Sequence, residues 1–210
     1  MRVFVLKPLS VCDTNCYIVA GDSGSCALID APDDAEYILE QIEMLGLTLK
    51  KIFLTHGHFD HVGAVADLVE ATGCEVYIHQ KDYSKLLNGD TVARFFGLGE
   101  VKPVKSAIPF GDDEILKLDE IEFSVLHTPG HTSGSCCFIA GDKMFTGDTL
   151  FARSVGRTDM PDGNTELLKR SLEKIYALTG DYTVYPGHMS VTTLEAERHY
   201  NPYLCHLGDI

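Results

Sequence analysis

The sequence lacks any long hydrophobic run, since no apolar stretch approaches the roughly 18 to 20 residues that a membrane-spanning helix needs. Its N-terminal segment, MRVFVLKP, is too short and too soon interrupted to act as a secretory signal. The 210 residues contain no linker, no low-complexity segment and no short-period repeat. We therefore expect one cytoplasmic domain over residues 1–210 that has no membrane partner.

Basic residues are also scarce. The 17 Lys and Arg stand against 31 Asp and Glu, which gives a formal net charge of -14 at pH 7. Proteins that bind nucleic acid depend on clustered Lys and Arg to contact phosphates, so this balance argues against a nucleic-acid partner. Hydrophobic residues at 45% and charged residues at 23% are ordinary for a globular protein and exclude a disordered or fibrous chain.

The seven cysteines do not suggest a disulfide framework, because the count is odd and the chain is long and has no secretory signal. Cys12 and Cys16 flank a predicted loop and could bind metal or undergo redox chemistry, but no second pair with suitable spacing accompanies them. Four others lie in apolar, strand-like runs and are predicted to be core residues: Cys26, Cys74, Cys136 and Cys137.

The order of hydrophobic patterns predicts an α/β fold. Strands are expected at 2–9, 15–30 (with a turn at 21–24), 51–55, 75–78, 114–118, 121–127, 134–140, 143–146 and 182–185, and helices at 34–45, 62–72, 81–88, 165–178 and 192–200. Residues 30–33 supply turn and capping chemistry for the first helix. Residues 89–110 are irregular, and 94–99 form either a flap over a site or a packed loop. Two face-to-face sheets with helices outside would bury both sets of strands.

The densest chemistry lies at residues 55–61, THGHFDH, directly after an apolar run. If this segment is extended, residues two apart project to the same side, so His56, His58 and Asp60 point together. His61 begins the next helix and leaves in another direction. We interpret the motif as His56 and His58 on one metal, and Asp60 and His61 on another. Zinc prefers four ligands, so distant segments must complete both sites.

Three later residues are suited to do so, namely His131, Asp148 and His188. Each follows a predicted strand and comes directly after a glycine, in TPGH, TGD and PGH. Glycine permits an unusual turn or a close backbone approach. Loops at strand ends on a rigid scaffold commonly carry functional residues.

Together these motifs resemble the metallo-β-lactamase-fold hydrolases over nearly the whole chain. The resemblance rests on THxHxDH at 55–61, GHT at 130–132, TGD at 146–148 and PGH at 186–188. It implies a four-layer αβ/βα sandwich of two packed mixed sheets with outer helices. It also implies the following ligand sets: His56, His58 and His131 on one metal, Asp60, His61 and His188 on the other, and Asp148 bridging both.

Residues 151–159 and 186–203 look like the glyoxalase II (hydroxyacylglutathione hydrolase) branch of that superfamily. The GRTD segment at 156–159 is shared with persulfide dioxygenases of the same fold. The chain ends soon after His188 and lacks the added helical segment that helps hold glutathione in full-length glyoxalase II. The resemblance therefore favours thioester chemistry over glutathione specificity.

The expected activity is hydrolysis of a small-molecule thioester by two divalent ions, zinc first, with iron or manganese as alternatives. Such ions, about 3.5 to 4 Å apart, share a water and lower its pKa. Asp60 and Asp148 are the catalytic candidates, with Asp60 orienting the attacking hydroxide. A thiolate leaving group, with a thiol pKa of about 8.5, needs little protonation, and the sequence offers no evident general acid.

Two alternatives remain open. The first is a mononuclear iron persulfide dioxygenase that uses His56, His131 and Asp148. The second is a metal-binding or redox module without turnover.

The other charged candidates are expected to be structural or solvated. This applies to four histidines that match no motif, His79, His127, His199 and His206. Arg157 and Asp159 are expected to form a buried or partly buried pair that fixes their loop. The acidic run 112–114 is expected to be a solvated turn.

Overall fold

The computed structural model describes residues 1–10, 12–88, 101–104 and 106–206, and within them the strands form two six-stranded sheets and a small ribbon. The first sheet has the order β1 (Arg2–Val5), β2 (Tyr17–Ala20), β3 (Ser25–Ile29), β4 (Thr48–Leu54), β5 (Glu75–His79) and β6 (Ile108–Phe110). The second has the order β14 (Thr192–Thr193), β13 (Thr183–Pro186), β10 (Lys143–Gly147), β9 (Cys136–Ala140), β8 (Ile121–His127) and β7 (Ile115–Leu118). Strands β11 (Leu150–Phe151) and β12 (Ser154–Val155) pair with each other. Both large sheets are mixed, since β3, β4, β5 and β6 are parallel neighbours in the first and β10 and β13 in the second.

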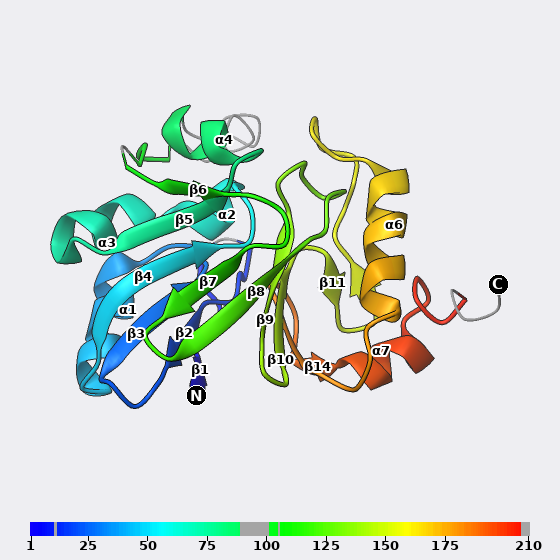
Figure 1. Cartoon of the computed structure of the whole chain (residues 1–210). Coiled ribbons are helices and arrows are strands. Elements are labelled where there is room, and N and C mark those ends of the chain that lie inside the picture. Colours follow the sequence, from blue (N-terminus) through cyan, green and yellow to red (C-terminus); the bar gives the residue numbers. More distant parts are fainter. Residues whose placement is uncertain (11, 89–100, 105, 207–210) are drawn as a thin grey trace.

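Helices cover the outer face of each sheet (Figure 1). Helices α1 (Ala35–Met44) and α3 (Val65–Thr72) share a buried hydrophobic cluster with the first sheet. Helices α6 (Thr165–Tyr176) and α7 (Leu194–Tyr200) share another with the second sheet. The layers are therefore helix, sheet, sheet, helix, which confirms the predicted αβ/βα sandwich. No helix in the described part of the chain has the length and apolar character to span a bilayer.

The outer layers follow from local sequence. Leu168, Leu172 and Ile175 recur at helical spacing on α6 and are buried on the second sheet. Asn164 caps this helix, because its side chain accepts a hydrogen bond from Leu167 N at 3.0 Å.

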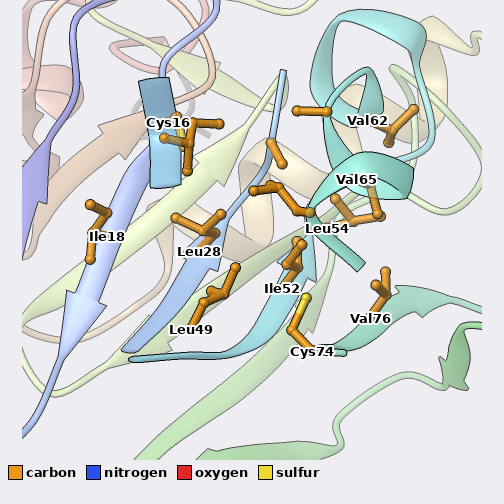
Figure 2. Packing of buried hydrophobic residues seen from close by; sticks show 14 of the residues in the cluster. Cys16, Ile18, Leu28, Leu49, Ile52, Leu54, Val62, Val65, Cys74 and Val76 are labelled. Atoms are coloured by element: carbon orange, nitrogen blue, oxygen red, sulfur yellow. The ribbon is translucent and has the colours of Figure 1, made fainter. Parts of the chain in front are cut away.

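The strand that leads into the histidine motif is buried on both faces. Alternate side chains of β4 point in opposite directions, so Ile52 and Leu54 enter the outer cluster, whereas Phe53 enters the layer between the sheets. Figure 2 shows Ile52 and Leu54 among the side chains that α3 and the adjacent strands contribute to the outer cluster.

Aromatic side chains fill the layer between the sheets. The ring centroid of Phe53 lies 5.0 Å from that of Phe123, 5.9 Å from Phe138 and 5.4 Å from Tyr77. Tilted and edge-on aromatic pairs at such distances stabilise a core beyond their area burial. This layer thus fixes β4 against β8 and β9, whose loops carry the site.

Several expectations of local structure are wrong. The helix expected over 62–72 is two helices, α2 (Phe59–Val62) and α3, and the first strand ends at Val5. Asp34, and not residues 30–33, caps α1 by accepting a hydrogen bond from Tyr37 N. Strand β6 lies in the stretch expected to be irregular, and β11 and β12 were not predicted, because strands of two or three residues carry no periodic signal. Helix α4 (Tyr83–Asn88) matches expectation, while residues 94–99 lie outside the described residues.

The cysteines are free thiols, and the four predicted core cysteines are buried. Cys16 is also buried, in the outer cluster (Figure 2), where its thiol donates to Asp30 O at 3.2 Å. Cys12 is exposed, and no metal-ligating group found among the described residues contains a cysteine.

Candidate metal centre

Seven side chains from loops and a short helix converge on one site. His56 and His58 follow β4, Asp60 and His61 lie in α2, His131 follows β8, Asp148 follows β10 and His188 follows β13. Their donor atoms form overlapping groups in which every atom lies within 4.8 Å of the others: His56, His58 and His131; Asp60, His61 and His188; His56, His61 and Asp148. All seven sequence candidates are therefore brought together.

The first group consists of three buried imidazoles. His58 Nδ1 lies 2.8 Å from His131 Nε2. The ring centroid of His56 lies 4.9 Å from that of His58 and 4.8 Å from that of His131, with each pair of rings nearly perpendicular. This arrangement presents three nitrogens to one point.

The second group combines a carboxylate with two imidazoles. Asp60 Oδ2 lies 3.4 Å from His188 Nε2 and 3.8 Å from His61 Nε2. Asp148 stands between the two groups. Its Oδ1 is 3.3 Å from His61 Nε2, and its Oδ2 is 3.3 Å from His188 Nε2 and 3.4 Å from His131 Nε2. One carboxylate thus faces donors of both groups.

The extended geometry expected for residues 56–60 is wrong. His58 is extended, with φ -76° and ψ 149°, but it is the residue before α2, and Asp60 lies in that helix. A helix turns the chain by about 100° per residue, so strand alternation does not hold between His58 and Asp60. Asp60 accordingly groups with His61 and not with His56 and His58.

Partners outside the site orient four of the histidines through Nδ1. These contacts are His56 with Thr55 Oγ1 at 3.1 Å, His61 with Asp30 Oδ2 at 2.8 Å, His131 with Arg157 O at 2.8 Å and His188 with Cys12 O at 3.1 Å. An acceptor at Nδ1 keeps the proton there and leaves the Nε2 lone pair facing inward, as metal-bound histidines require. His58 is reversed and presents Nδ1 to the site.

The donor atoms fit bound metal ions. Three buried side-chain atoms in the described part of the chain have no hydrogen-bond partner, and all three are here: His56 Nε2, His61 Nε2 and Asp148 Oδ1. An unsatisfied buried polar atom costs roughly 1 to 3 kcal/mol, so such atoms are rare without a function. Imidazole and carboxylate donors suit zinc, iron and manganese.

Burial and mutual charge set the protonation of the site. Burial, together with His61 and His131, holds the pKa of His56 well below its ordinary value, and burial with His131 lowers the pKa of His58 to about 3. Burial also opposes the charge on His61, but Asp148 and Asp30 raise its pKa well above the ordinary value. His56 and His58 are therefore neutral, as metal-ligating imidazoles must be.

Glycine at the strand ends permits close approach, as the sequence suggested. A Cβ on Gly187 would lie 2.3 Å from Asp148 Oδ1 and 2.8 Å from His61 Cε1. Gly147 has φ +47°, and its Cβ would lie 2.4 Å from Thr55 Oγ1. A larger residue at position 187 would displace a candidate ligand, and one at position 147 would displace Thr55, the partner of His56.

Sequence reasoning missed the residues that support the ligands. The carboxylate of Asp30 accepts hydrogen bonds from Thr55 N and Thr55 Oγ1 as well as from His61. Thr14 Oγ1 donates to Asp60 Oδ2 at 3.1 Å. Asp82, fully buried, accepts from the loops that carry the first group. The one available signal was an Asp at the end of a predicted strand, which Asp30 shares with Asp148.

His79 and His127 have a structural arrangement. Their rings stack at 4.3 Å with planes 7° apart, and they share the carboxylate of Asp112 at 2.8 and 3.1 Å. Two parallel, stacked rings have no common in-plane point at which an ion could bind both nitrogens. This arrangement fits the expectation that the two histidines are structural. Asp112 was expected in a solvated turn, but its carboxylate also pairs with both rings.

The remaining expectations concern exposed side chains. His199 and His206 are exposed, as expected. Arg157 and Asp159 do pair, at 2.6 and 2.8 Å, but their side chains are 55% and 67% exposed. The expected pairing is present, and the expected burial is wrong.

Comparison with known proteins places the fold and the site in one family. Residues 9–188 match the model of the Metallo-beta-lactamase superfamily. The chain is 39% identical over 202 residues to the hydroxyacylglutathione hydrolase GloC of Haemophilus influenzae, covering 94% of this chain and 95% of that protein.

Two solved structures are also similar. TTHA1623 in a di-iron-bound form is 39% identical, with a TM-score of 0.87, and the match covers 96% of this chain and 100% of that one. The BLEG-1 B3 metallo-beta-lactamase is 33% identical, with a TM-score of 0.90, over 97% and 99% of the two chains. The chain therefore belongs to the metallo-beta-lactamase superfamily and is a metal-dependent hydrolase with a His-rich dinuclear site.

Proposed function

We propose that the protein hydrolyses a small-molecule thioester, of the hydroxyacylglutathione type, at a site for two divalent ions. The observation that carries this proposal is the position of Asp148, whose two oxygens face donors of both ligand groups. The substrate class is supported by the similarity to GloC, which is named a hydroxyacylglutathione hydrolase and is matched over 95% of its length. Because GloC is matched over nearly its whole length, its name supports glutathione as the thiol carrier.

The ligand assignment follows the geometry. His56 Nε2, His58 Nδ1 and His131 Nε2 would hold one ion, and Asp60, His61 Nε2 and His188 Nε2 would hold the other. Asp148 lies between the two groups and would serve both. Zinc suits this donor set, and the di-iron form of TTHA1623 supports iron as the alternative. When bound, the ions supply a water of lowered pKa and positive charge for the oxygen of the attacked carbonyl.

Asp60 is placed to orient the attacking water. Burial opposes its charge, but His61 and a hydrogen bond with His188 lower its pKa to about 2. The carboxylate is therefore ionised at neutral pH and acts as a hydrogen-bond acceptor rather than an acid. Thr14 Oγ1 donates to its Oδ2, which fixes the direction in which the remaining lone pairs point.

The leaving group favours a thioester over an amide. A thiol has a pKa of about 8.5, so it departs as a thiolate with little proton transfer, whereas an amide nitrogen must be protonated. Asp60 and Asp148 are both ionised, since the pKa of Asp148 lies well below its ordinary value because His61 and His131 outweigh its burial. Neither carboxylate is a proton donor at neutral pH, and a thioester does not require one.

The test combines metal analysis with a substrate panel. The purified protein should bind two equivalents of metal and hydrolyse S-(2-hydroxyacyl)glutathione, and Asp148→Ala should lose both the second equivalent and the activity. Asp142→Ala removes an exposed carboxylate nearby in sequence and should change neither. Full activity with one bound ion would refute the dinuclear proposal.

The same panel separates the alternatives. Iron-dependent oxygen consumption with glutathione persulfide would show that the protein is a persulfide dioxygenase that uses His56, His131 and Asp148, and not a hydrolase. If the protein binds metal but turns over neither substrate, the remaining function is that of a metal-binding or redox module.

A further inference from the structure

Asp82 is a buried carboxylate between two loops that carry the first ligand group. It lies between β5 and α4 and has no exposed surface. Its Oδ2 accepts hydrogen bonds from Gly57 N and Thr132 Oγ1, both at 2.8 Å. Its Oδ1 accepts from Gly134 N at 3.0 Å and from Lys85 Nζ at 2.6 Å. Four donors thus meet on one side chain.

These donors flank the three histidines of the first group. Gly57 stands between His56 and His58, and Thr132 directly follows His131. The two loops are far apart in sequence, and Asp82 connects them by hydrogen bonds to both. A Cβ on Gly134 would lie 2.6 Å from Asp82 Cγ, so the loop backbone itself is shaped around the carboxylate.

The charge of Asp82 is compensated. Lys85 Nζ lies 2.6 Å from Asp82 Oδ1 and 2.5 Å from Asp162 Oδ2. Asp162 Oδ2 in turn accepts from Ser133 N at 2.9 Å and Ser133 Oγ at 3.0 Å. A buried charge is tolerated when it is paired and hydrogen-bonded, and this network also holds the loop after His131.

Different residues support the second ligand group. Asp30 orients His61, and Thr14 donates to Asp60. Asn15 Nδ2 donates to Pro186 O and Met189 O, each at 2.9 Å, on either side of His188. These supports come from residues 14–30, whereas the hydrogen-bond network of Asp82, Lys85 and Asp162 holds the loops of the first group. Asp30 also reaches the first group, since Thr55 Oγ1 donates to it and contacts His56 Nδ1.

We propose that Asp82 is a positioning residue for the first metal position alone, so that the two positions can be emptied independently. The proposal rests on the ligand assignment of the proposed function. Without its carboxylate, the loops that bear His58 and His131 lose their common acceptor, while the supports of His61, Asp60 and His188 remain.

The test uses Zn²⁺ titrated into metal-free protein against a competing chelator. Asp82→Asn keeps the size of the side chain but replaces one carboxylate oxygen by an amide N–H₂, which then faces the donors that this oxygen had accepted. The affinity for one Zn²⁺ ion should fall by about 10- to 100-fold, while the affinity for the other is unchanged. The matched control is Thr14→Val, which removes the donor to Asp60 and should weaken the other equivalent.

Double variants show which position is affected. In a His188→Ala background, where the first position remains, Asp82→Asn should weaken the remaining Zn²⁺ by the same factor. In a His58→Ala background, it should add little, since both changes act on one position. Equal weakening of both equivalents by Asp82→Asn, or equal effects in the two backgrounds, would overturn the proposal.

A second pair of variants applies if Asp82→Asn does not fold. Thr132→Val removes one hydrogen-bond donor to Asp82, and Thr132→Ser keeps it. The affinity for one Zn²⁺ ion should therefore fall in Thr132→Val and stay at the wild-type value in Thr132→Ser. Urea unfolding of the metal-free variants separates a change in metal affinity from a general loss of stability. Wild-type protein that binds fewer than two Zn²⁺ would refute the ligand assignment, whereas two Zn²⁺ held unchanged by Asp82→Asn and Thr132→Val would refute only the role of Asp82.

Discussion

Replacing Asp30 by Asn should reverse the tautomer of His61. Asp30 Oδ2 accepts the His61 Nδ1 proton at 2.8 Å, so the neutral ring, which is the form that binds metal, has its Nε2 lone pair facing Asp148. In Asp30→Asn, the amide oxygen can still accept from Thr55 N, so the amide N–H₂ faces His61 Nδ1. That nitrogen then becomes the acceptor, and the proton moves to Nε2, where a metal would bind.

The magnitude follows from one lost hydrogen bond in a buried place. When the variant binds metal, the proton of His61 must return to Nδ1, where it faces the amide N–H₂ of residue 30. Two donors then face each other, at a cost of roughly 1 to 3 kcal/mol. About 1.4 kcal/mol corresponds to a factor of ten, so the affinity for the ion held by His61 should fall roughly 5- to 150-fold. The ion held by His56, His58 and His131 should be affected less, because Asp30 contacts that group only indirectly, through Thr55 Oγ1, which donates to Asp30 and also contacts His56 Nδ1.

Two measurements check this prediction. Competition titration with Zn²⁺ gives the affinity of each equivalent. Because Asp148 and Asp30 raise the pKa of His61 well above its ordinary value, ¹⁵N chemical shifts report the tautomer in metal-free protein at a pH high enough to make the ring neutral. Asp33→Asn, at an exposed neighbour whose Oδ1 accepts from Asp34 N, is the control and should match wild type. An unchanged affinity together with a proton retained on His61 Nδ1 would refute the reasoning.

Three further predictions test the core, the titration of a buried histidine and a close contact. Phe53→Ala should lower the free energy of unfolding by about 3 to 5 kcal/mol in urea, because the ring fills the layer between the sheets, and a loss below about 1 kcal/mol would contradict this. Burial lowers the pKa of His79 below its ordinary value of 6.5, although the hydrogen bond with Asp112 opposes this shift. Below pH 6.5 the unfolded chain therefore binds more protons than the folded chain, and the free energy of unfolding falls as the pH drops. The decline in unfolding free energy from neutral pH to about pH 5 should be smaller in His79→Gln than in wild type, and equal slopes would argue against the assignment. Gly187→Ala should cost metal content, because the new Cβ would meet Asp148 Oδ1 at 2.3 Å, and two retained equivalents would disprove that contact.

The candidate ligands were visible in the sequence because each lies in a short local motif. Residues 55–61 hold four of them, and the other three directly follow glycines at strand ends. Their supports were invisible because the contacts span long separations. Asp82 is 50 residues from Thr132, and Asn15 is 171 residues from Pro186. No local pattern marks an Asp or Asn whose partners are fixed only by the packing of distant loops.

The fold was predictable to the extent that burial repeats along the chain. The apolar run ending in Leu54 predicted a strand, and β4 is buried on both faces of that run. The geometry of Asp60 was not predictable in this way. Helix α2 is only four residues long and follows the strand after a short loop, so strand alternation gave the wrong direction for the Asp60 side chain.

The position of the ligands links the site to the stability of the sandwich. His56, His58, Asp60 and His61 follow a strand of the first sheet, and the other three candidates follow strands of the second. Each three-residue group contains members from both sheets, so an ion held by either group connects the two halves. A ligand that binds only the folded state stabilises it by mass action, which makes metal affinity and sheet packing reciprocal. The aromatic layer around Phe53 therefore belongs to the same energetic unit as the site: loosening it separates the loops of β4 and β8, and an ion that holds His58 and His131 together opposes that separation.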